Sequence, residues 1–254
     1  MVTPTDLRIS IITGAGSGIG RATALKLARS GDLVAASDVN EEGLKATVKE
    51  IQSERLRCIS GLVDVRDRTR VENWCSEVID RFGKIDCLFS NAGLNARSAV
   101  DRMTLSQWNL LIDTHVTGTF SFCQVVLRHM VERKSGAIVI TSSDFAVVGV
   151  ANAANYCAAK TALYSLTKSL ALEFASYGIR VNAVGPGPID TPLLRAGRTP
   201  EEYENARRAF ESRLPIKRMG QPEEVAAVVE FLLSDRAAYI TGQLVQPNGG
   251  QVIW

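Results

Sequence analysis

Short apolar runs, rich in β-branched residues, alternate along the chain with longer stretches of helical pattern. Each run has the length and composition of a strand. The seven runs are residues 7–13, 32–38, 57–65, 85–93, 136–143, 179–187 and 242–250. Helices are expected between them at 18–31, 41–54, 68–83, about 105–132 and about 153–176.

Strands separated by helices of this length indicate successive βαβ units, which need right-handed crossovers and a parallel sheet covered on both faces. The sequence contains no internal repeat, low-complexity tract or linker, so residues 1–254 are expected to form a single α/β domain. The one irregular region, about 188–217, is polar, charged and flanked by proline, and it follows the end of a strand. It is therefore a candidate lid over a substrate site.

Composition narrows the class of protein. A chain of 254 residues, 46% hydrophobic and 22% charged, is long enough for one α/β domain with a substantial core and short for two full domains. The net charge of +2 and the lack of a Lys/Arg run argue against nucleic acid or an anionic membrane as a partner. The N-terminus lacks the pattern of a secretory signal, and no apolar stretch is expected to be long enough to span a bilayer.

Cysteine and histidine usage points to a cytoplasmic protein without a structural metal. The five cysteines are odd in number and include no CxxC pair, so they are expected to be reduced, buried small hydrophobes. With only two histidines and no Cys/His cluster, no zinc site is expected.

The segment TGAGSGIG, residues 13–20, lies directly between the first strand and the first helix. Glycines there allow a tight turn and close approach to a phosphate, and the following helix N-terminus offers free N–H groups. A glycine-rich run alone also simply makes turns, but this position in the first βα unit is typical of a dinucleotide site. The expected contacts are Gly14, Ser17, Gly18, Ile19 and Gly20.

Asp38 ends the second strand, where a dinucleotide fold places a carboxylate against the adenosine ribose hydroxyls. It would repel a 2′-phosphate, and neither Ser17 nor Val39 is a base that would bind one. The sequence therefore favours NAD over NADP as the cofactor. The alternative is that Asp38 only caps the next helix.

Tyr156 and Lys160 are spaced i and i+4, so they share one face of a helix. A nearby ammonium favours the phenolate and would lower the tyrosine pKa, which suits a general acid or base at an alcohol or carbonyl oxygen. Ser143 ends the preceding strand, at the edge that faces a dinucleotide crevice, where its hydroxyl can hold the reacting oxygen. A Tyr/Lys pair at this spacing is common by chance, but its combination with Ser143 and the glycine loop is not.

With these features the chain resembles the short-chain dehydrogenase/reductase family, in its ordinary single-domain subtype, over essentially its full length. The shared motifs are TGAGSGIG at 13–20, DV at 64–65, NAG at 91–93, SS at 142–143, YCAAK at 156–160, NAVGPGPIDTP at 182–192 and YITGQ at 239–243.

The resemblance implies a doubly wound, Rossmann-like fold with a seven-stranded parallel sheet. It also implies hydride transfer between a nicotinamide and a secondary alcohol or ketone, with Tyr156 as acid/base, Lys160 tuning it and binding the nicotinamide ribose, and Ser143 orienting the substrate oxygen. A homotetramer through the two long helices is implied as well. The further cofactor contacts that the resemblance implies are Asp64 and Val65 at the adenine, Asn91, Ala92 and Gly93 beside the adenosine ribose, and Pro186, Gly187, Ile189 and Thr191 on the nicotinamide side.

His115 falls where this family normally has a catalytic asparagine. In the family that asparagine perturbs its helix, and its backbone carbonyl holds a water of a proton relay, which does not depend on the side chain. The first hypothesis is that His115 preserves this geometry in an active enzyme. The others are an imidazole that joins the relay, a core histidine without a catalytic role, and a weakened active site.

The substrate is the least specified part. Candidate pocket residues are Leu94, Asn95, Asp144, Ala146, Val150, Asn152 and Gly187, together with the lid. The polar members Asn95, Asp144 and Asn152 favour a hydroxylated substrate such as a polyol or sugar derivative. The lid arginines Arg195, Arg198 and Arg213 could meet an anionic group, although a solvated charged face is the commoner explanation.

Three functions remain open. The first is an NAD-dependent dehydrogenase of a small secondary alcohol. The second is a 3-oxoacyl thioester reductase of fatty-acid synthesis, against which Asp38 argues because those reductases mostly use NADPH. The third is a catalytically weakened dinucleotide-binding protein, against which the intact Ser143, Tyr156 and Lys160 argue.

Overall fold

The computed structural model describes residues 7–253 and contains one seven-stranded, fully parallel sheet in the order β3-β2-β1-β4-β5-β6-β7. The strands are β1 Ile9–Thr13, β2 Leu33–Asp38, β3 Cys58–Leu62, β4 Cys87–Ser90, β5 Gly136–Thr141, β6 Ile179–Val184 and β7 Leu244–Val245. This arrangement confirms the predicted doubly wound, Rossmann-like fold, because the strand order reverses direction at β1.

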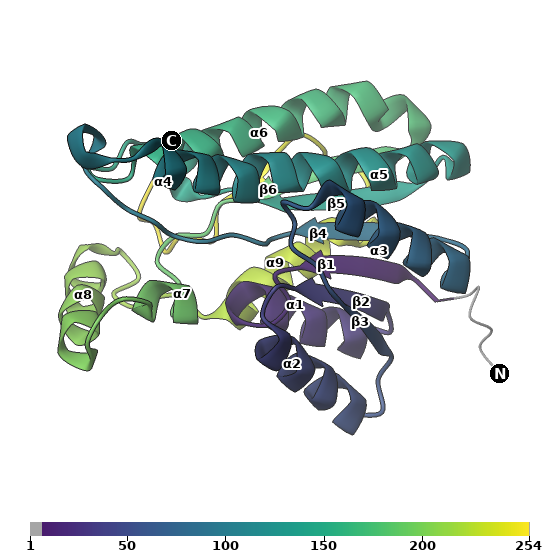
Figure 1. Cartoon of the computed structure of the whole chain (residues 1–254), viewed down its shortest axis with the longest axis horizontal. Coiled ribbons are helices and arrows are strands. Elements are labelled where there is room, and N and C mark those ends of the chain that lie inside the picture. The colour runs from purple at the N-terminus through teal and green to yellow at the C-terminus, as the bar shows by residue number, and fades with distance from the viewer. Residues whose placement is uncertain (1–6, 254) are drawn as a thin grey trace.

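Helices cover both faces of the sheet (Figure 1). The helices are α1 Gly18–Arg29, α2 Glu41–Ser53, α3 Arg68–Phe82, α4 Leu105–Leu111, η3 Ile112–Thr117, α5 Gly118–Arg133, α6 Ala154–Phe174, α7 Pro192–Arg195, α8 Pro200–Arg213 and α9 Pro222–Leu233. Short 3-10 turns lie at η2 Val100–Arg102, η4 Asp144–Ala146, η5 Ala175–Tyr177 and η6 Asp235–Ala237.

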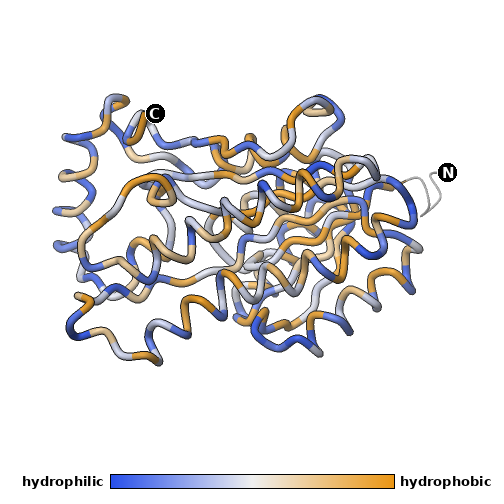
Figure 2. The backbone as a smooth tube through the Cα atoms, turned by 90° about the horizontal axis from the view of Figure 1, so that it is seen from above, coloured by the Kyte–Doolittle hydropathy of each residue, from blue (hydrophilic) through white to orange (hydrophobic). Residues whose placement is uncertain are grey.

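The alternation of side chains along each strand divides the core into two clusters. On β1, Ile9 and Ile11 belong to the cluster beneath α3, α5 and α6, whereas Ile12 belongs to the cluster beneath α1 and α9. On β5, Ile138 and Val139 separate in the same way. The strands β1, β2, β4, β5 and β6 each lie between two other strands and are buried along most of their length, whereas the edge strand β3 is partly exposed. Figure 2 shows the hydrophobic colour in the central strands.

Side-chain caps define where most surface helices begin. Asn40, Asp67, Thr104 and Thr199 each accept a backbone N–H from the first turn of α2, α3, α4 and α8, respectively. The N-cap of α1, Ser17, makes no such side-chain bond. The first turn of α1 is thus the one among these five whose N–H groups have no capping side chain.

The expected helix at 105–132 is continuous but is not a regular α-helix. Its central six residues, η3, form a π-helical turn with wider spacing, between α4 and α5. The combined run Leu105–Arg133 is apolar and long enough to cross a membrane by length and composition alone, contrary to the sequence expectation. More than half of it is buried in the protein, where it packs against α3 and α6 as a core helix does.

The predicted irregular lid at about 188–217 is mostly helical, which corrects that expectation. A proline at the first turn and a capping box between Thr199 and Glu202 start α8, and its surface is laced with Arg–Glu pairs. The segment α7–α8 stands apart from the layered body, at the left of Figure 1. The sequence prediction also omitted α9, although Gln221, Pro222 and Glu224 form a capping box and first turn at its start.

Candidate active site

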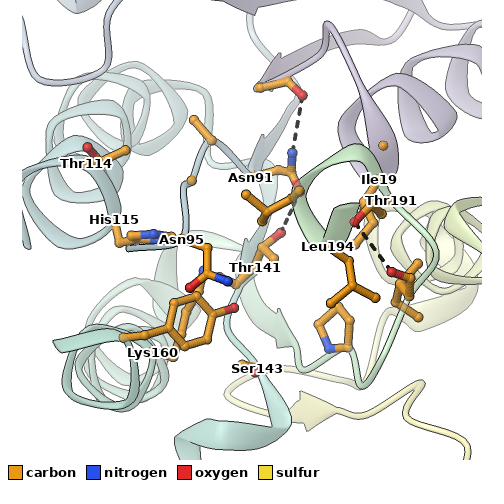
Figure 3. A pocket seen from close by; sticks show the side chains of 18 of the residues that line it. Ile19, Asn91, Asn95, Thr114, His115, Thr141, Ser143, Lys160, Thr191 and Leu194 are labelled. Atoms are coloured by element: carbon orange, nitrogen blue, oxygen red, sulfur yellow. Dashed lines mark hydrogen bonds between the residues drawn. The ribbon is translucent and has the colours of Figure 1, made fainter. Parts of the chain in front are cut away.

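One cavity of about 350 Å³ opens at the carboxyl edge of the sheet. The residues that follow each of the strands β1 to β6 line it, together with residues of η3, α6, α7 and α8. Parallel strands bring all of these segments to one edge because their carboxyl ends point the same way. In Figure 3, His115, Asn95 and Lys160 lie on one side of this cavity, Ile19, Thr191 and Leu194 lie on the other, and Asn91 and Thr141 lie between them.

The glycine loop is packed too tightly for side chains. A Cβ on Gly20 would lie 2.0 Å from the carbonyl oxygen of Gly14, and Gly14 itself has a positive φ of 67°. The loop therefore folds directly onto the start of α1, whose uncapped N–H groups face the cavity end lined by Ser17, Gly18 and Ile19. Uncapped N–H groups with the positive end of a helix dipole suit a phosphate.

A fixed carboxylate stands at the same end of the cavity. Asp38 accepts hydrogen bonds from the backbone N–H groups of Gly16 and Asn40, both at 2.8 Å. The nearest lining cation, Arg66, donates from Nε and Nη2 to the carboxylate of Asp64 and is thereby neutralised. This end of the cavity therefore offers hydroxyl acceptors and no unpaired cation among its lining residues.

Asn91 links the two halves of the cavity. Its Nδ2 donates to the Thr13 carbonyl at 3.2 Å, and its Oδ1 accepts from the Thr141 hydroxyl at 3.2 Å. The Thr141 carbonyl in turn accepts from Lys160 Nζ at 2.7 Å. Hydrogen bonds thus run continuously from the strand before the glycine loop to the lysine of α6. Val65, Ala92 and Gly93, also predicted from the sequence, line the cavity beside Asn91.

Tyr156 and Lys160 lie on one face of α6, as predicted, and Lys160 Nζ is 5.6 Å from the centre of the Tyr156 ring. A second pair with identical spacing, Tyr164 and Lys168, lies on the same helix. Only the first pair lines the cavity, and Lys160 is 3% exposed, whereas Lys168 is exposed. The structure therefore separates the two pairs, which spacing alone does not.

Burial dominates the electrostatics of this pair. It lowers the pKa of Lys160 to about 7. It raises the pKa of Tyr156 to about 12, although the neighbouring Ser143 hydroxyl opposes this rise. Burial therefore acts against the lowering of the tyrosine pKa that the sequence predicted, because both ionised forms lose water. In the free protein, burial therefore favours the uncharged form of both side chains.

His115 is 1% exposed and lies in the π-helical turn. Its Nε2 is 2.8 Å from the Leu94 carbonyl, to which it donates when protonated there. Its ring meets that of Tyr156 edge to face at 5.7 Å between centroids. Burial and the Coulombic effect of Lys160 lower the pKa of His115 to about 3, so the imidazole is neutral at physiological pH. The remaining nitrogen, Nδ1, has no hydrogen-bond partner among the described residues.

Ser143 and the adjacent Asp144 form the other wall. Ser143 Oγ donates to Asp144 Oδ1 and accepts from the Phe145 N–H, both at 3.1 Å. Asp144 is 2% exposed, and burial raises its pKa to about 6. Its second oxygen, Oδ2, has no partner in the described part of the chain.

The substrate candidates divide into two groups. Asn95, Asp144 and Gly187 line the cavity, as do the predicted Pro186, Ile189 and Thr191. Asn152 does not: it is exposed in a turn with a positive φ of 60°, which corrects its assignment to the substrate site. Leu94, Ala146, Val150 and the lid arginines Arg195, Arg198 and Arg213 are likewise absent from the lining.

Several lining residues were missed by sequence reasoning. Arg97 is exposed at the cavity, with its guanidinium 5.8 Å from the centre of the Phe145 ring, and Phe210 reaches the cavity from α8. Leu193, Leu194 and the C-terminal Gln251 complete this wall. Arg97 follows the NAG stretch and Phe145 follows the serine pair, so proximity to those motifs was the available signal.

Comparison with known proteins gives matches over nearly the whole chain. The family model described as enoyl-(acyl carrier protein) reductase matches residues 14–251. The 3-oxoacyl-[acyl-carrier-protein] reductase of Thermotoga maritima is 38% identical over 246 residues, covering 97% of this chain and 98% of that protein. Levodione reductase of Leifsonia aquatica is 38% identical over 251 residues, covering 96% and 94%.

Solved structures agree with these matches. The crystal structure of levodione reductase has a TM-score of 0.92 at 37% identity, covering 96% of this chain and 97% of that one. An actinorhodin polyketide ketoreductase solved with NADPH has a TM-score of 0.94 at 34% identity and covers 100% of both chains.

The depressed pKa of His115 predicts a pH-dependent contribution to stability. The unfolded chain takes up a proton near pH 6.5, whereas the folded chain resists it down to about pH 3. Stability contributed by neutral His115 is therefore complete above pH 6.5 and is lost as the pH falls below that value. We expect the free energy of unfolding of wild type, minus that of His115→Asn, to decrease between pH 7 and pH 4 in urea titrations.

The only other histidine provides the internal control. His129 is less buried, and its pKa is lowered by burial and by Arg133. Ring chemical shifts measured by NMR should show His129 titrating first and His115 unchanged down to pH 5. Titration of His115 between pH 6 and 7 would contradict its neutral assignment.

Proposed function

Because the chain belongs to the short-chain dehydrogenase/reductase family, we propose that it is an NAD(H)-dependent oxidoreductase that interconverts a small secondary alcohol and its ketone. In this proposal Tyr156 is the acid/base, Lys160 and the Asn91–Thr141 hydrogen bonds position it, and Ser143 holds the reacting oxygen. A polyol or sugar derivative is the favoured substrate class, because Asn95 and Asp144 put polar groups in the wall of the cavity.

One observation carries the proposal: the Tyr156–Lys160 pair and Ser143 share a single cavity with the uncapped first turn of α1. The cavity residues fit a nicotinamide dinucleotide. The glycine loop leaves room for a pyrophosphate at the helix N-terminus, Asp38 offers a carboxylate to a ribose, and Pro186, Ile189 and Thr191 line the opposite end. The nicotinamide supplies the hydride when bound.

The chain's own groups would handle the proton. In the reductive direction, the Tyr156 hydroxyl gives its proton to the carbonyl oxygen of the substrate while Ser143 hydrogen-bonds that oxygen. Lys160, with a pKa of about 7, exchanges protons readily near neutral pH and is held 2.7 Å from the Thr141 carbonyl. Burial excludes bulk water from the pair and so strengthens each of these hydrogen bonds.

We assign His115 a positioning role. The π-helical turn at residues 112–117 supports the hypothesis that the backbone there is perturbed as the family's asparagine would perturb it. The imidazole is neutral and bonded to Leu94, so a titrating role near pH 7 has no support from its pKa. His115 would act by fixing the segment after β4 against the Tyr156 ring.

The preference for NAD rests on charge. Asp38 is locked in place by two backbone N–H groups, and a 2′-phosphate beside it would meet a fixed negative charge. Arg66 is occupied by Asp64 and offers no free cation in return.

The alternative is a 3-oxoacyl thioester reductase. It is favoured by the name of the Thermotoga maritima relative, and the neighbouring ketoreductase was solved with NADPH. A preference of this chain for NADPH would support that alternative.

We further propose a homotetramer that works in the cytoplasm on a small molecule. Leu105 on α4 and Leu172 on α6 are 79% and 85% exposed, and Phe120 on α5 is 44% exposed. Apolar side chains exposed on neighbouring helices are typical of surfaces buried between subunits. All five cysteines are free thiols, which suits a reducing compartment.

The function is tested by NADH formation with the purified chain across secondary alcohols, polyols, sugar acids and a 3-hydroxyacyl thioester, each with NAD and NADP in parallel. We expect turnover of a small secondary alcohol with NAD. Tyr156→Phe should lower kcat by at least about 100-fold, because the acid/base is lost while the ring contacts remain.

Tyr164→Phe is the matched control, since it removes the hydroxyl of the second Tyr/Lys pair on the same helix. It should keep the activity of wild type. Absence of turnover on the whole panel, with dinucleotide binding intact, would instead favour a weakened dinucleotide-binding protein.

Asp38→Asn tests the cofactor assignment. The amide keeps a carbonyl acceptor for the Gly16 N–H but removes the charge, so we expect the ratio of kcat/KM for NADP to that for NAD to rise about tenfold, equivalent to about 1.4 kcal/mol. Asp80→Asn, at an exposed position on α3, controls for net charge. An unchanged ratio in Asp38→Asn would refute the charge argument.

The assembly is tested by light scattering coupled to size exclusion. We expect a particle of four times the chain mass of 27.5 kDa. Leu172→Arg should reduce that mass, because a charge buried between subunits is costly. Leu62→Arg, at an exposed position at the end of β3, should not, and a monomeric wild type would overturn the proposal.

A further inference from the structure

Two of the three hydrogen-bonding positions of the Ser143 hydroxyl are used by its neighbours in the chain. A serine hydroxyl has one donor and two acceptor positions. The donor goes to Asp144 Oδ1, and one acceptor takes the Phe145 N–H. The remaining position is therefore a lone pair, which can receive a proton from the neighbouring Tyr156 hydroxyl or from a substrate hydroxyl but cannot hydrogen-bond to a ketone oxygen.

The group that accepts the Ser143 hydrogen bond, Asp144, is a buried carboxyl group without a counter-ion among the described residues. Asp144 is buried, no lysine or arginine pairs with it among the described ion pairs, and its Oδ2 has no partner there. A buried carboxylate without a counter-ion takes up a proton more readily than an exposed one. The unpartnered Oδ2 is the atom on which such a proton can reside without displacing any bond in the structure.

We propose that Asp144 is a positioning residue that sets the hydrogen-bond direction of Ser143 and so selects between alcohol and ketone in the active site. This inference rests on the proposed function. Ionised Asp144 accepts the Ser143 hydroxyl proton, so Ser143 can accept a hydrogen bond from the alcohol as it binds, and the alcohol turns that proton to Tyr156 for the oxidation itself. When Asp144 is protonated, it is a weaker acceptor for the Ser143 hydroxyl, and Ser143 can then donate its hydrogen bond to a ketone oxygen instead. The switch takes up one proton from solvent and returns it there, outside the redox reaction.

The burial of Asp144 places this change in a measurable range, because its pKa is raised to about 6. The other titratable or charged groups that line the same cavity are Tyr156 and Lys160 on α6, His115 on η3, Arg97 after β4, and Asp38, Asp64 and Arg66 at the far end. Tyr156 titrates far above this region and His115 far below it, and Arg66 holds the pKa of Asp64 below its usual value. Lys160, with a pKa of about 7, also titrates between pH 5 and pH 8, and the Asp144→Asn variant, which leaves Lys160 in place, separates its effect from that of Asp144.

The experiment measures KM for a ketone with saturating NADH, and KM for its alcohol with saturating NAD, from pH 5 to pH 8. In wild type we expect the ketone KM to rise about tenfold across this range, while the alcohol KM does not rise. Asp144→Asn removes the ionisation, so its ketone KM should stay low and flat, with kcat changed far less than KM. The overall equilibrium constant is unaffected by any variant, which is why KM is read in each direction.

Two further variants keep the test decisive. Asp80→Asn, on exposed α3, should reproduce the wild-type pH profile. Asp144→Ala also frees the Ser143 proton and should show the same flat ketone KM, so either variant can carry the test if the other folds poorly. Because folding raises the pKa of Asp144 from 3.8 to about 6, its ionisation reduces stability as the pH rises through this range, and the loss is complete above about pH 6. Both variants should therefore unfold at a higher urea concentration than wild type at pH 8.

The outcomes separate the inference from the proposed function. A flat ketone KM in Asp144→Asn, against a rising one in wild type, supports the inference. A pH profile that Asp144→Asn shares with wild type overturns the inference alone, provided Tyr156→Phe still loses activity. Loss of kcat without a change in either KM would also overturn it, and no turnover by wild type on any substrate overturns both.

Discussion

The hydrogen bonds that pass through Asn91 and Thr141 hold the two halves of the site in one geometry. Asn91 ties the end of β1 to the end of β5, and the Thr141 carbonyl fixes Lys160. The glycine loop follows β1 and the Tyr156–Lys160 pair lies on the helix after β5, so this short series of bonds joins the two ends of the cavity to which we assign phosphate binding and proton transfer. This series of bonds depends on the strand order, because β1, β4 and β5 are adjacent in the sheet and so bring Thr13, Asn91 and Thr141 together.

Desolvation gives the site its chemical character. Burial pushes the pKa of Lys160 down and that of Tyr156 up, so in the free protein both groups avoid charge. The same burial raises the pKa of Asp144 and lowers that of His115. Burial thus favours the uncharged form of all four of these titratable groups around the cavity. A charge on a bound ligand would interact strongly with these groups, because little water is present to screen it.

Sequence pattern was sufficient for the fold and for residues whose role depends on backbone position. The glycine loop, Asp38 and the Tyr156–Lys160 spacing follow from strand ends and helical periodicity, and the structure places them in one cavity. Contacts that depend on packing could not be read in this way. Arg97 comes to the cavity through an irregular segment without periodicity, and Asn152 was assigned by proximity in sequence although its turn faces solvent. The direction of the Ser143 hydrogen bond depends on side-chain geometry alone.

His115, at the position where the resemblance implies an asparagine, fits among its neighbours because Gly93 has no side chain. A Cβ on Gly93 would lie 2.5 Å from His115 Cε1, so the larger imidazole occupies space that the glycine leaves open. The ring then reaches the Leu94 carbonyl, which satisfies Nε2 without disturbing the π-helical turn. The ring is neutral and meets that of Tyr156 edge to face, so it links the segment after β4 to the Tyr156–Lys160 pair. This arrangement requires glycine at position 93, because a side chain there would displace His115 and so remove the ring against which Tyr156 packs.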